Sequence, residues 1–305
     1  MVPTRRLSQI FPLFLCVSSL PALAAPTTEI TATFKIANDY LIIVPVTING
    51  SGPYDFVLDT GSNNTMLDQK LADELALPHG SERISVGVMG SVTMSAVYAN
   101  SLSIAGATVA GKDLFLFTSA DAKGLPRKVR GVLGEDFLQN FDVLLDYRHQ
   151  VLQLESGLGT LAATLTGEHL PVQLSGTLQG KSTFRRLIVI GRIQELGDNS
   201  PLSLVLDSGV NSLILFRKHL VLGASQHMFE GAAFNSSGLA AMETRTIRKL
   251  ALGKDEVNDL TVIAHTGQPE SDTDGLIPTS LFHSIFISHR GRFVILNPSL
   301  PKKNP

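Results

Sequence analysis

Two short motifs in the sequence carry side chains that could do acid–base chemistry. Asp59-Thr60-Gly61-Ser62 follows the apolar residues 56–58, and Asp207-Ser208-Gly209-Val210 follows the apolar residues 204–206. Two carboxylates a few ångströms apart share one proton, because both cannot easily ionise at the same pH. One then acts as a base and the other as an acid, so the pair can activate a water molecule without a metal or a covalent nucleophile.

The residues beside the two aspartates suit this chemistry. Gly61 and Gly209 have no side chain, so backbone N–H groups can approach the carboxylates. The hydroxyls of Thr60 and Ser208 can form hydrogen bonds across an axis between the motifs. We therefore expect the two loops to be locked against each other.

The motifs belong to an internal repeat with two copies of about 130 residues. Gly131-Val132-Leu133-Gly134 stands downstream of the first motif, and Gly275-Leu276-Ile277-Pro278 stands at a similar distance downstream of the second. Each copy then ends in a strand-like run, at 143–154 and at 285–296. A pseudo-twofold axis between two such units would bring the two aspartates side by side.

The repeat also predicts how the chain divides. We expect an N-terminal lobe at residues 25–160 and a C-terminal lobe at residues 161–305. The small residues between 156 and 167 read as a linker between the lobes. Because both halves of the site come from one chain, no dimer is needed to build it, and we expect a monomer.

The composition predicts a folded chain that is rich in strands. Hydrophobic residues make up 44% and charged residues 17% of the 305 residues, which is enough apolar material for a core. Short Val, Ile and Leu runs alternate with Gly, Ser and Asn, a pattern typical of strands and turns. One short helix is expected at 68–76, with Asp68 as its N-cap and Pro78 just beyond its end.

The charge balance argues against nucleic acid as a partner. Lys and Arg number 25 against 27 acidic residues, which gives a net charge of −2, and no long basic block is present. The eight His residues show no His-Glu-x-x-His spacing, so neither a metal nor another cofactor is expected. Asp136, Asp142 and Asp146 read as loop and edge-strand charges, and Arg185-Arg186 as the mark of a strand edge.

The N-terminus has the layout of a secretory signal peptide. Arg5 and Arg6 precede an apolar stretch at 10–23, which ends in small residues up to Ala24. We expect cleavage after Ala24, so residues 1–24 are the signal peptide and the mature protein is periplasmic or secreted. No later segment reaches about 18 uninterrupted apolar residues, so we expect no membrane insertion after the signal is removed.

At the two motifs the sequence resembles the aspartic peptidases, in particular a bacterial retropepsin-like group in which the domain is duplicated within one chain. The resemblance covers most of the mature protein, and Val132-Leu133-Gly134 matches the family's hydrophobic-hydrophobic-Gly segment. It implies an all-β, bilobal fold with two pseudo-twofold-related lobes and few short helices. It also implies an endopeptidase that acts on polypeptides, with Asp59 and Asp207 as the catalytic dyad. Ser62 would then hydrogen-bond the outer oxygen of Asp59.

The resemblance further implies two flaps that close over an extended peptide. The first would be a hairpin centred near Gly87 and Gly90. The second would be a hairpin centred near Ser237 and Gly238. Gly and Ser suit the tips of such hairpins.

Two departures from the family pattern leave an alternative open. Val210 stands where a hydroxyl could support Asp207, and Pro278 stands where the first copy has Gly134. The alternative is an inactive pseudo-peptidase that binds a peptide or a partner protein in the same place. Carboxylates within hydrogen-bonding reach of each other would favour the enzyme, and separation by many ångströms would favour the binding protein. A third hypothesis, a purely structural β-protein, predicts no cleft between lobes.

Overall fold

The computed structural model describes residues 28–87, 90–118, 121–122, 124–157, 159–178, 181–196, 200–216, 227–231, 240–265 and 273–299. Across these residues the chain forms 23 strands, three short α-helices and two 3-10 turns. The all-β prediction is confirmed. None of the helices in the described part of the chain is long and apolar enough to cross a bilayer. The expected signal peptide lies outside the described residues and stays a prediction.

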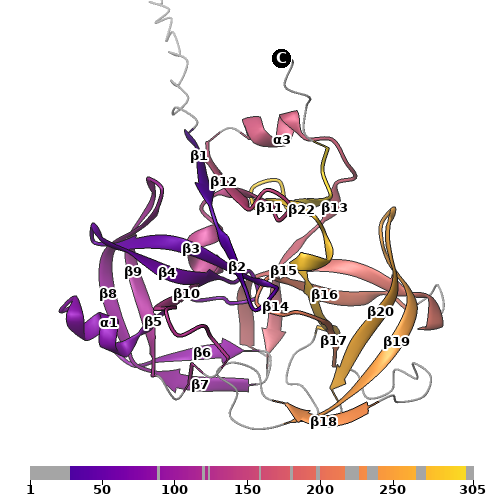
Figure 1. The fold of residues 1–305 in the computed structure, drawn as a ribbon, viewed down its shortest axis with the longest axis horizontal. Helices are drawn as coiled ribbons and strands as arrows, with labels where there is room; N and C mark the ends of the chain where they lie inside the picture. Colours follow the sequence, from indigo (N-terminus) through magenta and orange to yellow (C-terminus); the bar gives the residue numbers. More distant parts are fainter. Residues whose placement is uncertain are drawn as a thin grey trace, which may run out of the picture.

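The first lobe is built on a seven-stranded sheet, which occupies the left of Figure 1. Pairing between β3 and β8 closes six of its strands into a barrel. In the order of pairing, the strands are β2 (Lys35–Ala37), β3 (Leu41–Ile48), β4 (Ser51–Leu58), β10 (Gly131–Leu133), β5 (Met66–Asp68), β9 (Ala107–Phe117) and β8 (Ala96–Ile104).

The second lobe is built on an eight-stranded sheet, on the right of Figure 1. Six of its strands repeat the pairing order of the first barrel, and pairing between β15 and β19 closes them in the same way. In the order of pairing, the strands are β14 (Gln173–Leu178), β15 (Lys181–Ile193), β16 (Leu202–Asp207), β21 (Gly275–Pro278), β17 (Leu213–Leu215), β20 (Asp255–His265), β19 (Ala240–Leu252) and β18 (His227–Gly231).

A six-stranded sheet joins the two lobes, above them in Figure 1. It takes three strands from each half of the chain, and the halves meet where β11 pairs antiparallel with β22. All five residues of β11 are buried, because both faces of this central strand are covered. In the order of pairing, the strands are β1 (Thr28–Thr33), β12 (Val151–Ser156), β11 (Asp142–Asp146), β22 (Ser284–Ser288), β23 (Phe293–Leu296) and β13 (Leu170–Pro171).

The helices are short and lie outside the barrels. The predicted helix at 68–76 is confirmed as α1 (Gln69–Glu74), with the Asp68 side chain accepting the Lys70 N–H at 3.3 Å. Helix α2 (Glu135–Leu138) follows β10 directly. Helix α3 (Thr160–Thr164) stands where a linker was expected, because Leu161 packs into an apolar cluster on the six-stranded sheet.

The burial of apolar residues in the core explains why the sequence predicted the strands that lead to the two motifs. One buried apolar cluster runs through both lobes and includes alternating residues of the strands that lead to the motifs. The opposite faces of those strands form smaller clusters, one in each lobe, beside the Asp loops. Val57 and Val205, each two residues before its aspartate, occupy equivalent places in these clusters. The strands are therefore buried on both faces and carry continuous apolar runs.

Candidate functional site

The two motif aspartates meet between the lobes. Asp59 directly follows β4, and Asp207 is the last residue of β16. The carboxyl group of each aspartate lies against the glycine of the other loop, so the two groups come together at the junction of the lobes. Asp207 is 6% exposed, whereas Asp59 is partly exposed. The separation that would have favoured the binding protein is therefore not observed.

Each carboxylate is held by the glycine of its own loop and faces the glycine of the other. The N–H of Gly61 donates to Oδ1 of Asp59 at 2.9 Å, and the N–H of Gly209 donates to Oδ1 of Asp207 at 2.7 Å. A Cβ on Gly61 would lie 2.3 Å from Cγ of Asp207, and one on Gly209 would lie 2.9 Å from Cγ of Asp59. Only glycine leaves room for the dyad at these two positions.

The hydroxyls of Thr60 and Ser208 lock the two loops together, as the sequence predicted. Oγ1 of Thr60 donates to the Leu206 carbonyl at 3.0 Å and accepts the Ser208 N–H at 3.1 Å. Oγ of Ser208 donates to the Leu58 carbonyl at 2.8 Å and accepts the Thr60 N–H at 3.0 Å. Both side chains are fully buried, so four hydrogen bonds cross between the lobes without competition from water.

We expect Thr60→Val to destabilise the protein by about 1–3 kcal/mol, because it leaves the buried Ser208 N–H and Leu206 carbonyl without their partner. Urea unfolding followed by circular dichroism measures this change. Thr108→Val is a matched control, since the Thr108 hydroxyl bonds Ser103 at an exposed position. Equal stabilities for the two variants would contradict the role of the interlock.

The environment separates the proton affinities of the two carboxyl groups. Burial raises the pKa of Asp59, while hydrogen bonds from the Gly61 and Ser62 backbone and with Asp207 offset part of that rise. Burial and the negative charge of Asp59 raise the pKa of Asp207 well above its ordinary value. The two groups titrate as a coupled pair, and the burial of both favours the form in which they hold one proton between them. The pair therefore keeps a proton to higher pH than an exposed aspartate would.

A strand passes beneath each aspartate. Strand β10 runs parallel to β4, and the Asp59 N–H donates to the Leu133 carbonyl at 2.9 Å. Strand β21 runs parallel to β16 in the same register, with Pro278 opposite Asp207. Pro278 therefore leaves the position of this strand unchanged. In the first lobe the N–H of Gly134 donates to the Thr65 hydroxyl. The second lobe cannot form the equivalent bond, because Pro278 has no N–H to donate.

Ser62 and Val210 occupy equivalent positions, each three residues after the aspartate of its lobe. The Ser62 hydroxyl donates to the Asn64 carbonyl at 2.9 Å instead of the outer oxygen of Asp59, so the expected contact is wrong. It is the Ser62 backbone N–H that serves Asp59. Val210 packs against the apolar cluster of the second lobe that contains Val205 and Leu276. Neither lobe uses a hydroxyl at this position to support its aspartate.

The first predicted flap is a hairpin of β6 (Arg83–Gly87) and β7 (Gly90–Met94), paired up to Gly87 and Gly90. Two large apolar side chains on this hairpin are exposed, Ile84 at 53% and Val92 at 39%. In the second lobe β18 and β19 form a hairpin that is paired up to Gly231 and Ala240. Ser237 and Gly238 lie outside the described residues.

Two residues near the dyad were not predicted as site residues by the sequence. Burial and the negative charges of Asp207 and Asp59 raise the pKa of Tyr40, so its phenol lies in the field of the dyad. Arg186 is 2% exposed and lies within a strand, so its interpretation as a strand edge is wrong. Its positive charge lowers the pKa of Asp207. No local signal marks either residue, because only strand pairing brings them to the site.

The interpretation of three acidic residues as loop or edge charges is also wrong. Asp136 lies in α2, and Asp142 and Asp146 lie in β11, the buried strand at the centre of the interlobe sheet. All three are less than 9% exposed and are hydrogen-bonded, for example Asp136 to the Thr65 hydroxyl at 2.6 Å. Within the described ranges, no group of three or more His, Cys, Asp and Glu could hold a metal ion.

Two closed β-barrels thus meet at paired Asp-Thr-Gly and Asp-Ser-Gly loops, which is the all-β, bilobal arrangement that the sequence predicted. Residues 44–137 match the family model described as "Aspartyl protease". One similar solved structure is a retropepsin-like aspartic protease from Rickettsia conorii, at 16% identity and a TM-score of 0.31. That match covers 44% of this chain and 94% of the other. No curated protein matches the sequence.

Proposed function

We propose that the protein is an aspartic endopeptidase in which Asp59 and Asp207 activate water for attack on a peptide bond. The observation that carries the proposal is the pair of interlocked Asp loops, which places the carboxyl group of each aspartate against the glycine of the other loop. Asp59 removes a proton from the water as it attacks the carbonyl carbon. Asp207 hydrogen-bonds the carbonyl oxygen as negative charge develops on it, and a proton then reaches the leaving nitrogen.

The substrate in this proposal is an extended polypeptide. A hairpin that lies over the bound chain can add backbone hydrogen bonds to it, and in this proposal β6–β7 takes that role. The exposed Ile84 and Val92 would then cover the apolar side chains of the substrate. The two hairpins would serve as the flaps of the first and second lobes.

The experiment is cleavage of a diverse peptide library by the purified mature chain from about pH 3 to about pH 8, with and without a statine inhibitor. We expect cuts that the inhibitor blocks. A folded protein that makes no cut would favour the pseudo-peptidase, and binding of uncut peptides would then identify its ligand.

We expect the activity to be greatest in the acidic to mildly acidic range. Asp207 must be protonated to act as the acid, and its pKa is raised, so activity is lost as the pH rises through that pKa. Activity also falls at low pH, where Asp59 gains a proton and can no longer act as the base. The kcat/KM profile of the best peptide from the library measures this limit. Activity that keeps rising above about pH 8 would contradict the assignment.

Export of the chain is a further part of the proposal, and it is supported by the signal-like layout of residues 1–24. N-terminal sequencing of the protein recovered from outside the cytoplasm is expected to begin at Ala25. Recovery of the protein only in the cytoplasm, with its first 24 residues intact, would contradict it.

A further inference from the structure

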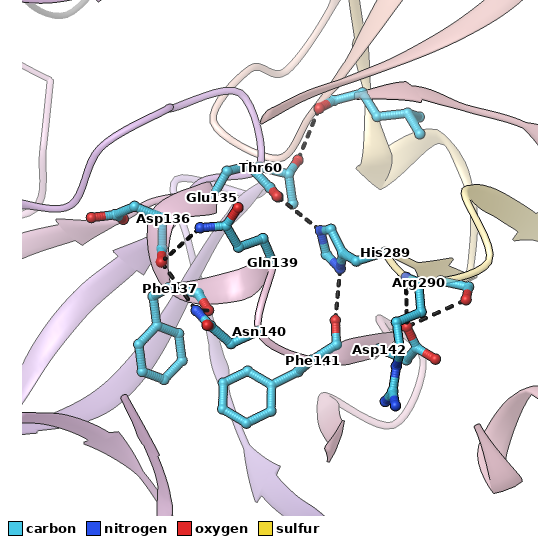
Figure 2. Close-up of polar contacts among 12 residues, drawn as sticks. Thr60, Glu135, Asp136, Phe137, Gln139, Asn140, Phe141, Asp142, His289 and Arg290 are labelled. Carbon is cyan, nitrogen blue, oxygen red and sulfur yellow. Dashed lines mark hydrogen bonds and ion pairs between the residues drawn. The ribbon is translucent and has the colours of Figure 1, made fainter. Parts of the chain in front are cut away.

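A buried histidine and a buried glutamate meet between the first lobe and the interlobe sheet (Figure 2). Glu135 is the first residue of α2 and is 1% exposed, and His289 lies in the turn after β22 and is 7% exposed. Nε2 of His289 lies 2.8 Å from Oε2 of Glu135, and Nδ1 lies 2.7 Å from the Phe141 carbonyl oxygen. A carbonyl oxygen only accepts, so Nδ1 carries a hydrogen.

The contact between Nε2 and Oε2 therefore needs one further proton, carried by either the ring or the carboxyl group. Without that proton both atoms are acceptors, and they face each other across 2.8 Å in a buried place. The other carboxylate oxygen, Oε1 of Glu135, is buried and has no hydrogen-bond partner among the described residues. The pair is thus held together by a single shared proton.

The surroundings make the pair retain this proton to higher pH. Burial lowers the pKa of His289, but the charge and hydrogen bond of Glu135, the Phe141 carbonyl and the charge of Asp142 raise it above the ordinary 6.5. Burial raises the pKa of Glu135, and the charges of Asp136 and Asp59 raise it further against the opposing effect of His289. Both shifts act in the same direction, so the proton is lost above pH 6.5.

The other charged groups around the pair do not reverse the rise in the pKa values of His289 and Glu135. Asp142 accepts the Ser288 hydroxyl at 3.3 Å and the Arg290 N–H at 3.4 Å beside His289. The Arg290 residue itself is exposed. Nζ of Lys112 donates to the backbone carbonyl of Asp136 at 2.5 Å on the helix side.

The pair is connected to the dyad through the start of α2. The Glu135 N–H donates to the Ser62 carbonyl at 2.8 Å, and the Asp136 N–H donates to the Asn63 carbonyl at 3.2 Å. These two bonds hold the stretch of chain that follows Asp59. A shift of α2 would therefore move the loop that sets the position of this carboxylate.

We propose that Glu135 and His289 are positioning residues for Asp59, and that they anchor α2 and the Asp59 loop only while they hold their shared proton. Loss of the proton on the alkaline side releases the anchor. The effect on turnover rests on the proposed peptidase function, whereas the effect on stability does not. The pair would add an alkaline limit to the activity that is separate from the titration of the dyad.

Glu135→Gln tests the proposal, because the amide can donate to Nε2 of a neutral His289 and keeps the bond without a titrating proton. In the wild-type protein the stabilisation by the pair is complete below pH 6.5 and declines as the pH rises through the raised pKa. In Glu135→Gln a buried neutral His289 must become charged at low pH, so this contribution declines as the pH falls. Denaturant unfolding from about pH 5 to about pH 9 is expected to show opposite slopes.

His149→Gln is the matched control. His149 forms a similar contact with Asp146 at 2.7 Å in the same sheet, but its side chain is 65% exposed. We expect this variant to keep the wild-type slope. Equal slopes for wild type and Glu135→Gln would overturn the proposal. So would an NMR titration of His289 in the wild-type protein with a midpoint below 6.5, which needs no variant.

Peptide hydrolysis gives the second readout. If the pair limits activity, the alkaline limb of kcat/KM in Glu135→Gln moves up by at least about one pH unit. If the dyad alone sets the limb, removal of the Glu135 charge favours ionisation of the aspartates, and the limb moves down. A downward or absent shift overturns the positioning role. If no peptide is cleaved at all, the endopeptidase proposal fails, and the unfolding slopes still decide whether the pair shares a proton.

Discussion

Replacement of either Asp59 or Asp207 by asparagine is expected to reduce peptide hydrolysis by at least about a thousandfold. Asn cannot share a proton, so Asp59→Asn removes the base and Asp207→Asn removes the acid. Purified variants assayed on the best library peptide measure the loss. Asp73→Asn is the control, since Asp73 lies on the exposed side of α1 and is expected to leave kcat/KM unchanged.

The same substitutions are expected to leave the protein folded and no less stable at neutral pH. Burial raises the pKa of both aspartates, so their ionisation destabilises the folded state as the pH rises above the ordinary value of 3.8. An amide at Asp207, the more buried position, removes that cost. We therefore expect these substitutions to abolish activity without lowering the free energy of unfolding. Comparable turnover in wild type and both variants would contradict the dyad mechanism.

The second large effect is expected for Gly61→Ala. The new methyl group would lie 2.3 Å from Cγ of Asp207, and the buried carboxyl group has nowhere to move without breaking its bond to Gly209. We expect a loss of at least about a hundredfold in kcat/KM, because a displacement of about 1 Å at the reacting groups costs that much. We also expect a loss of about 1–3 kcal/mol in the free energy of unfolding.

Gly80→Ala is the matched control for this substitution. A Cβ at Gly80 would meet its nearest neighbour, the Ala96 carbonyl oxygen, at 3.5 Å, which is an ordinary contact. We expect the control to stay within about 0.5 kcal/mol of the wild type and to keep full activity. If Gly61→Ala behaves like Gly80→Ala, the close packing of the glycine against Asp207 has no functional role.

The features that could be predicted are those that depend on neighbouring residues. Helix α1 was readable because Asp68 caps it and the apolar spacing is local. The β6–β7 hairpin was readable from Gly87 and Gly90 at its tip. The repeated motif with an apolar run before each Asp indicated two strands that end at one axis, and the observed interlock of Thr60 with Ser208 agrees with it.

The errors over the buried charged residues share a cause, which is that burial and pairing across the fold are not local. Arg186 resembles a surface charge in the sequence, yet it is buried in β15, which pairs with β14 on one side and with β16 on the other. Asp142 and Asp146 resemble edge charges, but β11 is covered by β12 on one side and β22 on the other. The Ser62 hydroxyl was expected to turn toward Asp59, but the local turn offers it the Asn64 carbonyl.

The sequence by itself therefore determined the strand-rich class, the two Asp motifs and the residue types needed to lock them, because these follow from local patterns that occur twice. Only the tertiary structure decided that the pKa values of both aspartates are raised, since that depends on their burial and on their approach to each other, with the charge of Arg186 opposing the rise at Asp207. It also decided that Glu135 meets His289, a contact between residues 154 positions apart. Interactions over such separations depend on how whole sheets pack, and no short segment of the chain encodes them.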